Sequence, residues 1–555
     1  MTPTPEHLLM APILLPLLAG ALMLFYEDRR AKRVISIATA GMLPVIAFLL
    51  LDRAEAPSGG TEVRLYLLGD WPPPFAIVLV LDRLSALMLL LTSVLALPAL
   101  AFAVAGWDRQ GQHFHSLFQF LLMGLNGAFL TGDLFNLFVF FEVLLAASYG
   151  LMLHGSGPLR VRAGLHYIAI NLAASLLFLI GVSLIYGVTG TLNMADLAVR
   201  VSELPEVDRG LLRAGAASLG IAFLVKAAMW PLCFWLPITY MAAAPPVAAV
   251  FTVMSKVGVY AVLRVASLAF GAGASHSAGL GAELLVAGGM ATIAFGTFGV
   301  LASQGLGRLV GCSVLVSSGT FLAAVGMVLL GGGTAMLAGA LYYMVSSTLA
   351  LSALFLMVDL VERNQGGVAA MLAVTAEAYG FGDEELDTDV PTAELALPGT
   401  MTVLGLCFAA CALLLAGLPP LSGFVGKFAL LSGMLNPGGL GAQDATTSPL
   451  ALGFTALLIL SGLAALVALL RIGIQTFWVP SEEEPPKVLI IEIAPVIALL
   501  AVTLALTVEA QPVMRYMQAT AAALHRPEVY VEGVLGAPRV QDEAGEAGPG
   551  EGAGE

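Results

Sequence analysis

Four charged residues stand inside apolar runs of this sequence, where an unpaired charge is costly. Glu142 lies in FNLFVFFEVLLAASYG, and Lys226, Lys256 and Lys427 lie within or at the ends of other apolar runs. The chain has only five lysines, so three of them occupy such positions. A carboxylate at the centre of a membrane helix costs on the order of 3 kcal/mol. A partner or a function must therefore offset the cost of these residues.

Buried glutamate and lysine are suited to proton transfer. Most arginines lie in loops or at helix ends and stay protonated almost anywhere, whereas a desolvated lysine can release and regain a proton near neutral pH. A Glu and a Lys about 4 Å apart attract each other by roughly 4 kcal/mol at an effective dielectric of about 20. A Glu142 that approaches and leaves Lys226 would therefore act as a switch for proton release. The alternative is a static ion pair that holds two helices together.

The composition indicates a polytopic membrane protein. The chain has 555 residues, of which 59% are hydrophobic and 11% charged, and its mean hydropathy is +0.92. Apolar spans of about 18 or more residues, the length that crosses a bilayer, recur along nearly the whole chain. We predict an all-α fold of about 14 transmembrane helices that begin near residues 8, 34, 84, 114, 134, 163, 211, 246, 281, 307, 334, 398, 450 and 488.

Two of the predicted helices are interrupted by prolines next to a lysine. Pro231 follows Lys226, and Pro419 and Pro420 precede Lys427. Proline removes backbone hydrogen bonds, and free backbone groups at membrane depth are tolerated only inside protein or beside a water-filled cavity. The breaks fall in the seventh and twelfth helices, which predicts two inverted five-helix repeats, helices 4–8 and 9–13, as in secondary transporters. Two unrelated proline kinks are the alternative.

These observations give a division of the chain. We predict three N-terminal helices over residues 1–110, a first five-helix repeat over 111–272, a second over 273–480 with an acidic loop at 362–398, a C-terminal helix over 481–526, and a flexible acidic tail over 527–555.

No cofactor or metal site is expected. Cys407 and Cys411 have an i, i+4 spacing that a metal could use, but no His or further Cys stands nearby to complete a site. The chain has no Gly-rich phosphate loop and no haem or iron–sulfur attachment pattern. We therefore expect no cofactor, no enzymatic catalytic residue and no nucleic-acid partner.

Four segments carry a resemblance to a known family. The chain resembles the antiporter-like membrane subunits shared by respiratory complex I and the multisubunit Mrp-type cation/proton antiporters, and most of all the D-type subunit of the Mrp antiporters, which are also called Mnh or Pha. The resemblance covers most of the chain from about residue 70 to 480. The segments, in the expected order, are DLFNLFVFFEVLLAASYGLML, VKAAMWPLCFWLP, APPVAAVFTVMSKVGVYAVLR and GLPPLSGFVGKFALL.

The resemblance implies a role for each buried charge. Glu142 matches the family's fifth-helix glutamate, and Lys226 matches its partner on the seventh helix. Lys256 matches the eighth-helix lysine of the central hydrophilic axis, and Lys427 matches the terminal proton site on the twelfth helix. In the family, these groups and water conduct protons laterally through the membrane domain.

The sequence departs from complex I relatives at two places. Those relatives carry histidines where this chain has Cys233 and Tyr240, which favours the Mrp branch. On the eleventh helix, relatives often have a histidine and a lysine where this chain has Ser346 and Leu351. The central relay is therefore either interrupted or carried by water and hydroxyl groups.

Five residues are auxiliary relay candidates. Ser346, Ser347 and Thr348 supply the hydroxyl groups of the eleventh helix. Tyr240 is expected to form a hydrogen bond beside the first break, and His166 either joins a relay or is a packing histidine.

The resemblance implies secondary active transport rather than enzymatic catalysis, with protons exchanged for Na⁺ or K⁺. The expected partners are antiporter subunits of the A, B, C, E, F and G types and the lipid bilayer. One alternative is a proton-translocating subunit of a complex I or membrane-bound hydrogenase assembly. The other is a scaffold subunit that transports nothing.

The orientation of the chain follows from its basic residues. The cluster EDRRAKR after the first apolar span predicts a cytoplasmic loop there. With an even number of helices, both termini then lie on the external side. The expected location is the bacterial inner membrane.

Overall fold

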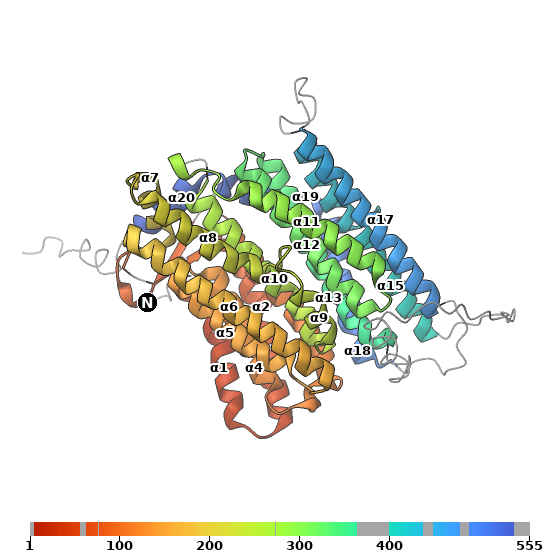
Figure 1. Cartoon of the computed structure of the whole chain (residues 1–555). Helices are drawn as coiled ribbons and strands as arrows, with labels where there is room; N and C mark the ends of the chain where they lie inside the picture. The colour runs from red at the N-terminus through yellow and green to blue at the C-terminus, as the bar shows by residue number, and fades with distance from the viewer. Residues whose placement is uncertain are drawn as a thin grey trace, which may run out of the picture.

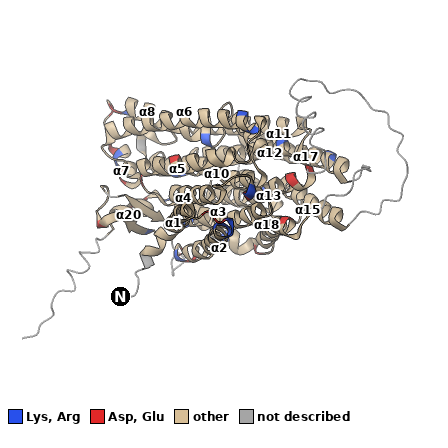
Figure 2. Ribbon diagram, turned by 90° about the horizontal axis from the view of Figure 1, so that it is seen from below, with Lys and Arg blue, Asp and Glu red and all other residues tan. Residues whose placement is uncertain are grey.

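Long apolar runs form a bundle of roughly parallel helices in the computed structural model of this protein (Figure 1). Within the described residues, twelve helices are long and apolar enough to cross a membrane. Charged residues are sparse along these helices (Figure 2). The predicted class, an all-α multi-pass membrane protein, is confirmed, whereas the count of about 14 crossings stays a prediction. The structure describes residues 5–55, 63–75, 77–271, 274–362, 399–436, 448–477 and 488–537.

The helices begin within a few residues of most predicted starts. In chain order the elements are η1 Pro5–Met10, α1 Ala11–Phe25, α2 Arg29–Arg53, β1 Arg64–Leu67, η2 Leu68–Asp70, β2 Val78–Leu81, α3 Arg83–Val104, η3 Trp107–Gln110, α4 Phe114–Leu130, α5 Leu134–Met152, α6 Pro158–Thr189, α7 Met194–Glu203, α8 Arg209–Lys226, α9 Trp235–Ala242, α10 Pro245–Ala269, η4 Ser275–Ser277, α11 Ala282–Ala302, α12 Leu306–Leu329, α13 Thr334–Glu362, α15 Gly399–Ala416, α16 Ser422–Leu435, α17 Pro449–Phe477, α18 Ile490–Val508, α19 Ala510–Leu524 and α20 Pro527–Leu535.

Two sets of helices make up most of the bundle, and both contain a broken member. The first set is α4, α5, α6, α8 with α9, and α10; the second is α11, α12, α13, α15 with α16, and α17. In each set the first helix packs on the second, and the third packs on the broken fourth. The sets meet where α10 packs on α13 and α9 packs on α12 (Figure 1). The inverted relation of the two sets stays a prediction.

A short hairpin and three C-terminal helices lie outside these two sets. Strands β1 and β2 pair antiparallel, although no strand is predicted from the sequence. The predicted single helix over 481–526 is two helices, α18 and α19. The predicted flexible tail is wrong at its start, because residues 527–535 form α20, in which Tyr530 and Val534 are buried. Residues 363–398 and 538–555, the acidic loop and the rest of the tail, lie outside the described residues.

A buried ion pair lies beside the hairpin and α20. Asp82 caps α3 by accepting a hydrogen bond from the backbone N–H of Ser85. The guanidinium of Arg264, on α10, donates to both Asp82 carboxylate oxygens over 2.5 and 2.7 Å. Arg264 also lies 5.2 Å from the ring centre of Tyr530, on α20. The pair therefore joins α3, α10 and the C-terminal segment.

We expect Asp82→Asn to destabilise the folded chain by about 3–5 kcal/mol, because it leaves the buried Arg264 charge unpaired. Burial alone would raise the pKa of Asp82, but the charge and hydrogen bonds of Arg264, with those of Ser85, outweigh burial and lower it. The stabilisation is therefore present above about pH 4, the pKa of an unfolded Asp, and is lost as pH falls through the lower folded value.

Thermal unfolding of the purified protein in detergent measures this effect. Asp196→Asn is the matched control, because Asp196 pairs with a half-exposed arginine one turn along α7 and such a pair contributes about 0–1 kcal/mol. Equal melting temperatures for the two variants at pH 7 would contradict the expectation.

Candidate functional site

The first helix break places Lys226 at the end of α8. Pro231 has no backbone N–H, so the helix cannot continue through it. Ala228 adopts a left-handed backbone conformation with φ of 55°. The indole N–H of Trp235, at the start of α9, donates to the carbonyl of Val225 over 3.1 Å. A side chain therefore supplies a hydrogen bond that the broken helix lacks.

Lys226 is buried, and its ammonium group has no hydrogen-bond partner among the described residues. The Nζ atom lies 5.0 Å from the ring centre of Phe141, on α5. Helix α10 packs directly against the break, since a Cβ at Gly258 would lie 2.5 Å from the backbone nitrogen of Ala227. A small cavity adjoins Lys226, and it is lined by Phe141, Leu144, Leu145, Tyr167, Asn171, Trp235, Met254 and Val257.

Glu142 follows Phe141 on α5, but it does not bond to Lys226. Its carboxylate accepts a hydrogen bond from the hydroxyl of Ser175, on α6. Lys226 makes no hydrogen bond within the described part of the chain, so the predicted pair is apart in this structure. The Glu142 carboxylate is therefore bonded to Ser175, and the Lys226 ammonium lies over the ring of Phe141.

Lys256 lies fully buried at the centre of the bundle, on α10. Its Nζ donates to the hydroxyl groups of Ser317 over 2.9 Å and Ser318 over 3.0 Å, both on α12. Ser317 in turn shares a 2.8 Å hydrogen bond with Ser347, on α13. Three helices thus contribute to one chain of polar atoms that begins at Lys256.

The second break places Lys427 one turn into α16. Helical hydrogen bonds to the carbonyls of Leu415 and Ala416 would come from residues 419 and 420, and both are prolines without an N–H. Lys427 Nζ donates to these two carbonyls instead, over 2.9 and 3.0 Å. Gly417, with φ of 76°, has no side chain, which leaves room for the lysine stem beside it.

A polar cavity links the central lysine to the second break. It is lined by Ser317 and Ser347, which belong to the Lys256 chain, and by Lys427. Ser313, Ser461 and Tyr343 also line the cavity, and the hydroxyls of Ser313 and Ser461 donate to carbonyls of their own helices. Hydroxyl groups both donate and accept hydrogen bonds, so this lining is suited to pass a proton between the two lysines through water.

The auxiliary candidates lie in different places. Ser347 belongs to the chain at Lys256, and Ser346 shares a 2.8 Å hydrogen bond with Ser422, at the start of α16. The Thr348 hydroxyl donates to its own helix. Tyr240 donates to the carbonyl of Phe251, on α10, over 2.6 Å. His166 is exposed on α6, so the structure does not bring it to the other candidates.

Sequence reasoning missed the hydroxyl partners of the charged groups. Ser175 is in the same run as His166, GLHYIAINLAAS, one turn beyond Asn171, and Asn171 and Ser175 lie on the buried face. Ser317 and Ser318 form the pair in VSSG on α12. A serine in an apolar helix is a weak signal because it can bond to its own backbone.

Comparison with known proteins decides the family. The family described as "NADH:quinone oxidoreductase/Mrp antiporter, TM" matches residues 131–440, which include Glu142, Lys226, Lys256 and Lys427. This chain belongs to that family. The match also confirms the resemblance seen in the four sequence segments.

Individual relatives within this family match over nearly the whole chain. A protein of Rhizobium meliloti (strain 1021), named as the D subunit of a probable K(+)/H(+) antiporter, is 58% identical and covers 97% of this chain and 99% of its own length. The D subunit of the Na(+)/H(+) antiporter of Alkalihalophilus pseudofirmus is 34% identical, with coverage of 96% and 99%.

Solved structures share the fold of this family member. A chain in the Mrp complex from Dietzia sp. DQ12-45-1b superposes with a TM-score of 0.79 at 27% identity, over 96% of this chain and 100% of that chain. A chain of respiratory complex I from Thermus thermophilus has a TM-score of 0.72 at 22% identity, over 94% and 99%. The second similarity is one of fold alone.

Proposed function

We propose that this chain is the D-type member of a heteromeric antiporter that exchanges protons for K⁺ or Na⁺, and that it conducts protons along Glu142, Lys226, Lys256 and Lys427. The observation that carries the proposal is the chain of hydroxyl groups from Lys256 to the cavity beside Lys427. The names of the relatives support the exchange activity. Partner subunits would be of the A, B, C, E, F and G types.

The first half of the path works as a charge switch. When the Glu142 carboxylate approaches Lys226, attraction between them stabilises the ammonium ion. When Glu142 returns to Ser175, that attraction weakens and Lys226 passes its proton on. The small cavity beside Lys226 and the absence of a hydrogen bond from its ammonium to the described residues fit this step, because the ammonium can then form the hydrogen bond to an acceptor along which its proton moves.

The second half of the path is a hydroxyl relay. A proton from Lys256 would pass through Ser317 and Ser347 to water in the cavity, and then to Lys427. The carbonyls freed by Pro419 and Pro420 would stabilise the protonated Lys427. Ser317 and Ser347 would thus carry the relay in a chain that has Ser346 and Leu351 where relatives often have a histidine and a lysine.

The orientation of the protein in the membrane belongs to the same proposal. The basic cluster after α1 would lie in the cytoplasm, and both termini would lie outside the inner membrane of a bacterium. The two helix sets would be inverted repeats, so each break would serve a half-channel to one side of the membrane.

The experiment that tests the function uses inside-out vesicles that carry the whole antiporter assembly. After respiration has acidified the vesicle interior, addition of KCl or NaCl should raise the internal pH, whereas choline chloride should not. K⁺ is added first because the relative at 58% identity is named for K⁺. Proton movement that requires electron transfer and ignores both cations would instead favour a redox-driven pump.

We expect Ser317→Ala with Ser347→Ala to slow exchange about 2- to 10-fold, the effect of losing about 0.5–1.5 kcal/mol of hydrogen bonding that water replaces only in part. The assay is the initial rate of K⁺-induced proton movement in the same vesicles. Ser183→Ala is the control, because Ser183 is exposed on α6 and donates only to its own helix. Equal rates for the double variant and wild type would contradict the hydroxyl relay.

A further inference from the structure

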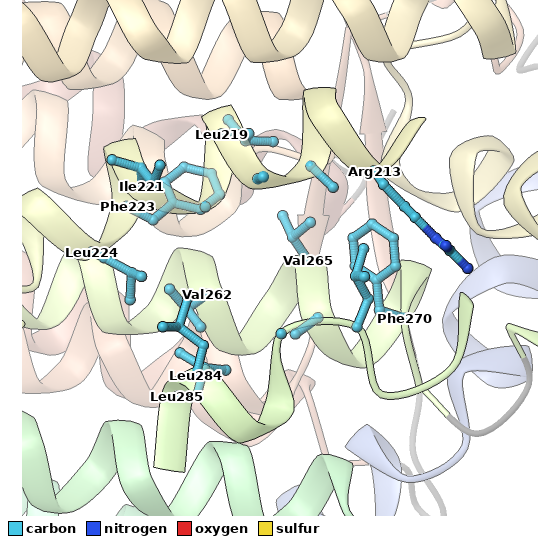
Figure 3. A pocket seen from close by; sticks show the side chains of 16 residues that line it. Arg213, Leu219, Ile221, Phe223, Leu224, Val262, Val265, Phe270, Leu284 and Leu285 are labelled. Atoms are coloured by element: carbon cyan, nitrogen blue, oxygen red, sulfur yellow. The ribbon is translucent and has the colours of Figure 1, made fainter. Parts of the chain in front are cut away.

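An apolar crevice lies outside the lysine chain, between α8, α10 and α11 (Figure 3). Its walls are apolar side chains that include Phe223, Val262, Phe270 and Leu284. Leu284 is 57% exposed, so the crevice opens at the surface of the bundle. Arg213 is the only charged residue among the described residues that line it. The crevice is therefore shaped for an elongated apolar ligand with a polar end.

The length of the crevice along α8 matches one leaflet of a membrane. Along α8 its lining runs from Arg213 to Leu224, a rise of roughly 16 Å. The hydrocarbon core of a bilayer is about 30 Å thick, so one leaflet occupies about half of it. Arg213 lies near the start of α8, and Leu224 lies near the break at Lys226. A ligand held here would extend from the membrane surface to the midplane.

Arg213 supplies charge at the outer end. In Figure 3 its side chain extends past Phe270, and the guanidinium points away from the apolar walls. Its side chain is exposed, and no carboxylate pairs with it within the described part of the chain. A guanidinium binds phosphate oxygens through two parallel hydrogen bonds. Arginine at this position therefore complements a phosphate headgroup.

We propose that this crevice binds one anionic phospholipid, with an acyl chain between α8, α10 and α11 and the phosphate at Arg213. The lipid has a structural consequence for the proton path. Phe223 lines the crevice, and its ring centre lies 6.2 Å from that of Phe141, which lies under the Lys226 ammonium. The bound chain packs behind Phe223 and supports the wall of the Lys226 site.

Two variants test the site in the intact antiporter assembly. Gly220→Leu fills the crevice, because a Cβ at Gly220 meets nothing within 4 Å. Arg213→Gln removes the charge and keeps the apolar walls. Their matched controls are Gly187→Leu, at an open and exposed position on α6, and Arg162→Gln, an exposed arginine elsewhere on α6.

The readout is native mass spectrometry of the assembly after exchange into nanodiscs of phosphatidylcholine with phosphatidylglycerol. Wild type should retain one phosphatidylglycerol more than Gly220→Leu does. Arg213→Gln should bind phosphatidylglycerol about fivefold more weakly, the effect of one arginine at an anionic surface. Both controls should behave as wild type.

Three results would overturn the proposal. One is equal retention of phosphatidylglycerol by wild type and Gly220→Leu. Another is that wild type and Arg213→Gln retain phosphatidylglycerol and phosphatidylcholine in the same proportion. That result would show that the crevice binds acyl chains without selecting the headgroup. The third is a crosslink from position 284 to a helix of another protein in the assembly, which would show that protein fills the crevice. If Gly220→Leu fails to assemble, Arg213→Gln alone decides the question.

Discussion

Replacement of Lys256 by methionine should reduce cation-driven proton movement by at least about 100-fold, the usual contribution of a group that transfers a proton. Lys256 is the residue that connects the two helix sets, because it lies on α10 and donates to Ser317 and Ser318 on α12. Methionine has a similar length but carries no proton. Without the ammonium group, a proton from the first set has no acceptor at the centre.

A second substitution shows whether Lys256 transfers a proton or only supplies charge. Lys256→Arg keeps the charge but holds its proton too tightly to release it, so we expect it to be as inactive as Lys256→Met. Lys32→Met, at the start of α2, is the control for loss of a lysine, since its Nζ donates only to the carbonyl of Gln112 among the described residues. Full activity in Lys256→Arg would make Lys256 a fixed charge and contradict the relay.

Lys226→Met should also reduce exchange by at least about 100-fold while the complex still assembles. The ammonium of Lys226 makes no hydrogen bond to the described residues, so methionine removes no such bond that holds the fold together. Methionine also suits the position beside the Phe141 ring, because a thioether packs well against aromatic carbon.

Lys226→Met also distinguishes the proposed switch from a static ion pair between Glu142 and Lys226. Removal of one partner from a buried pair typically costs about 3–5 kcal/mol of stability. A static Glu142–Lys226 pair therefore predicts that Lys226→Met assembles poorly and that Lys226→Met with Glu142→Gln recovers. Abundance of the complex in membranes, measured by immunoblot beside the exchange rate, decides between the two. Normal abundance with normal exchange would contradict both.

The spacing of apolar runs is sufficient to predict most of the long helices, and the prolines are sufficient to predict the breaks. Both signals are local, since an apolar run must lie in lipid or protein and a proline cannot donate a hydrogen bond. The prediction that Lys427 lies beside a break therefore needed no knowledge of the fold. Helix α20 was missed because its segment is short and followed by a Gly- and Glu-rich tail, while its order comes from Tyr530 packing on Arg264.

The polar partners of the charged groups could not be predicted in the same way. Ser175 reaches Glu142 from α6, and Ser317 reaches Lys256 from α12, so each contact depends on how distant helices pack. Serines occur throughout this chain, and many hydroxyl groups bond to their own helix, as that of Thr348 does on α13. Only the packed structure shows which hydroxyl groups face a buried charge.

The most direct test of the proposed relay is the substitution Glu142→Gln, which keeps the size of the side chain and removes only the titrating charge. K⁺- and Na⁺-induced proton movement is measured in inside-out vesicles that carry the whole assembly, at matched abundance of the complex. We predict that exchange is lost while assembly is normal. Exchange that survives with an unchanged pH dependence would show that Glu142 is a structural residue and would contradict the relay.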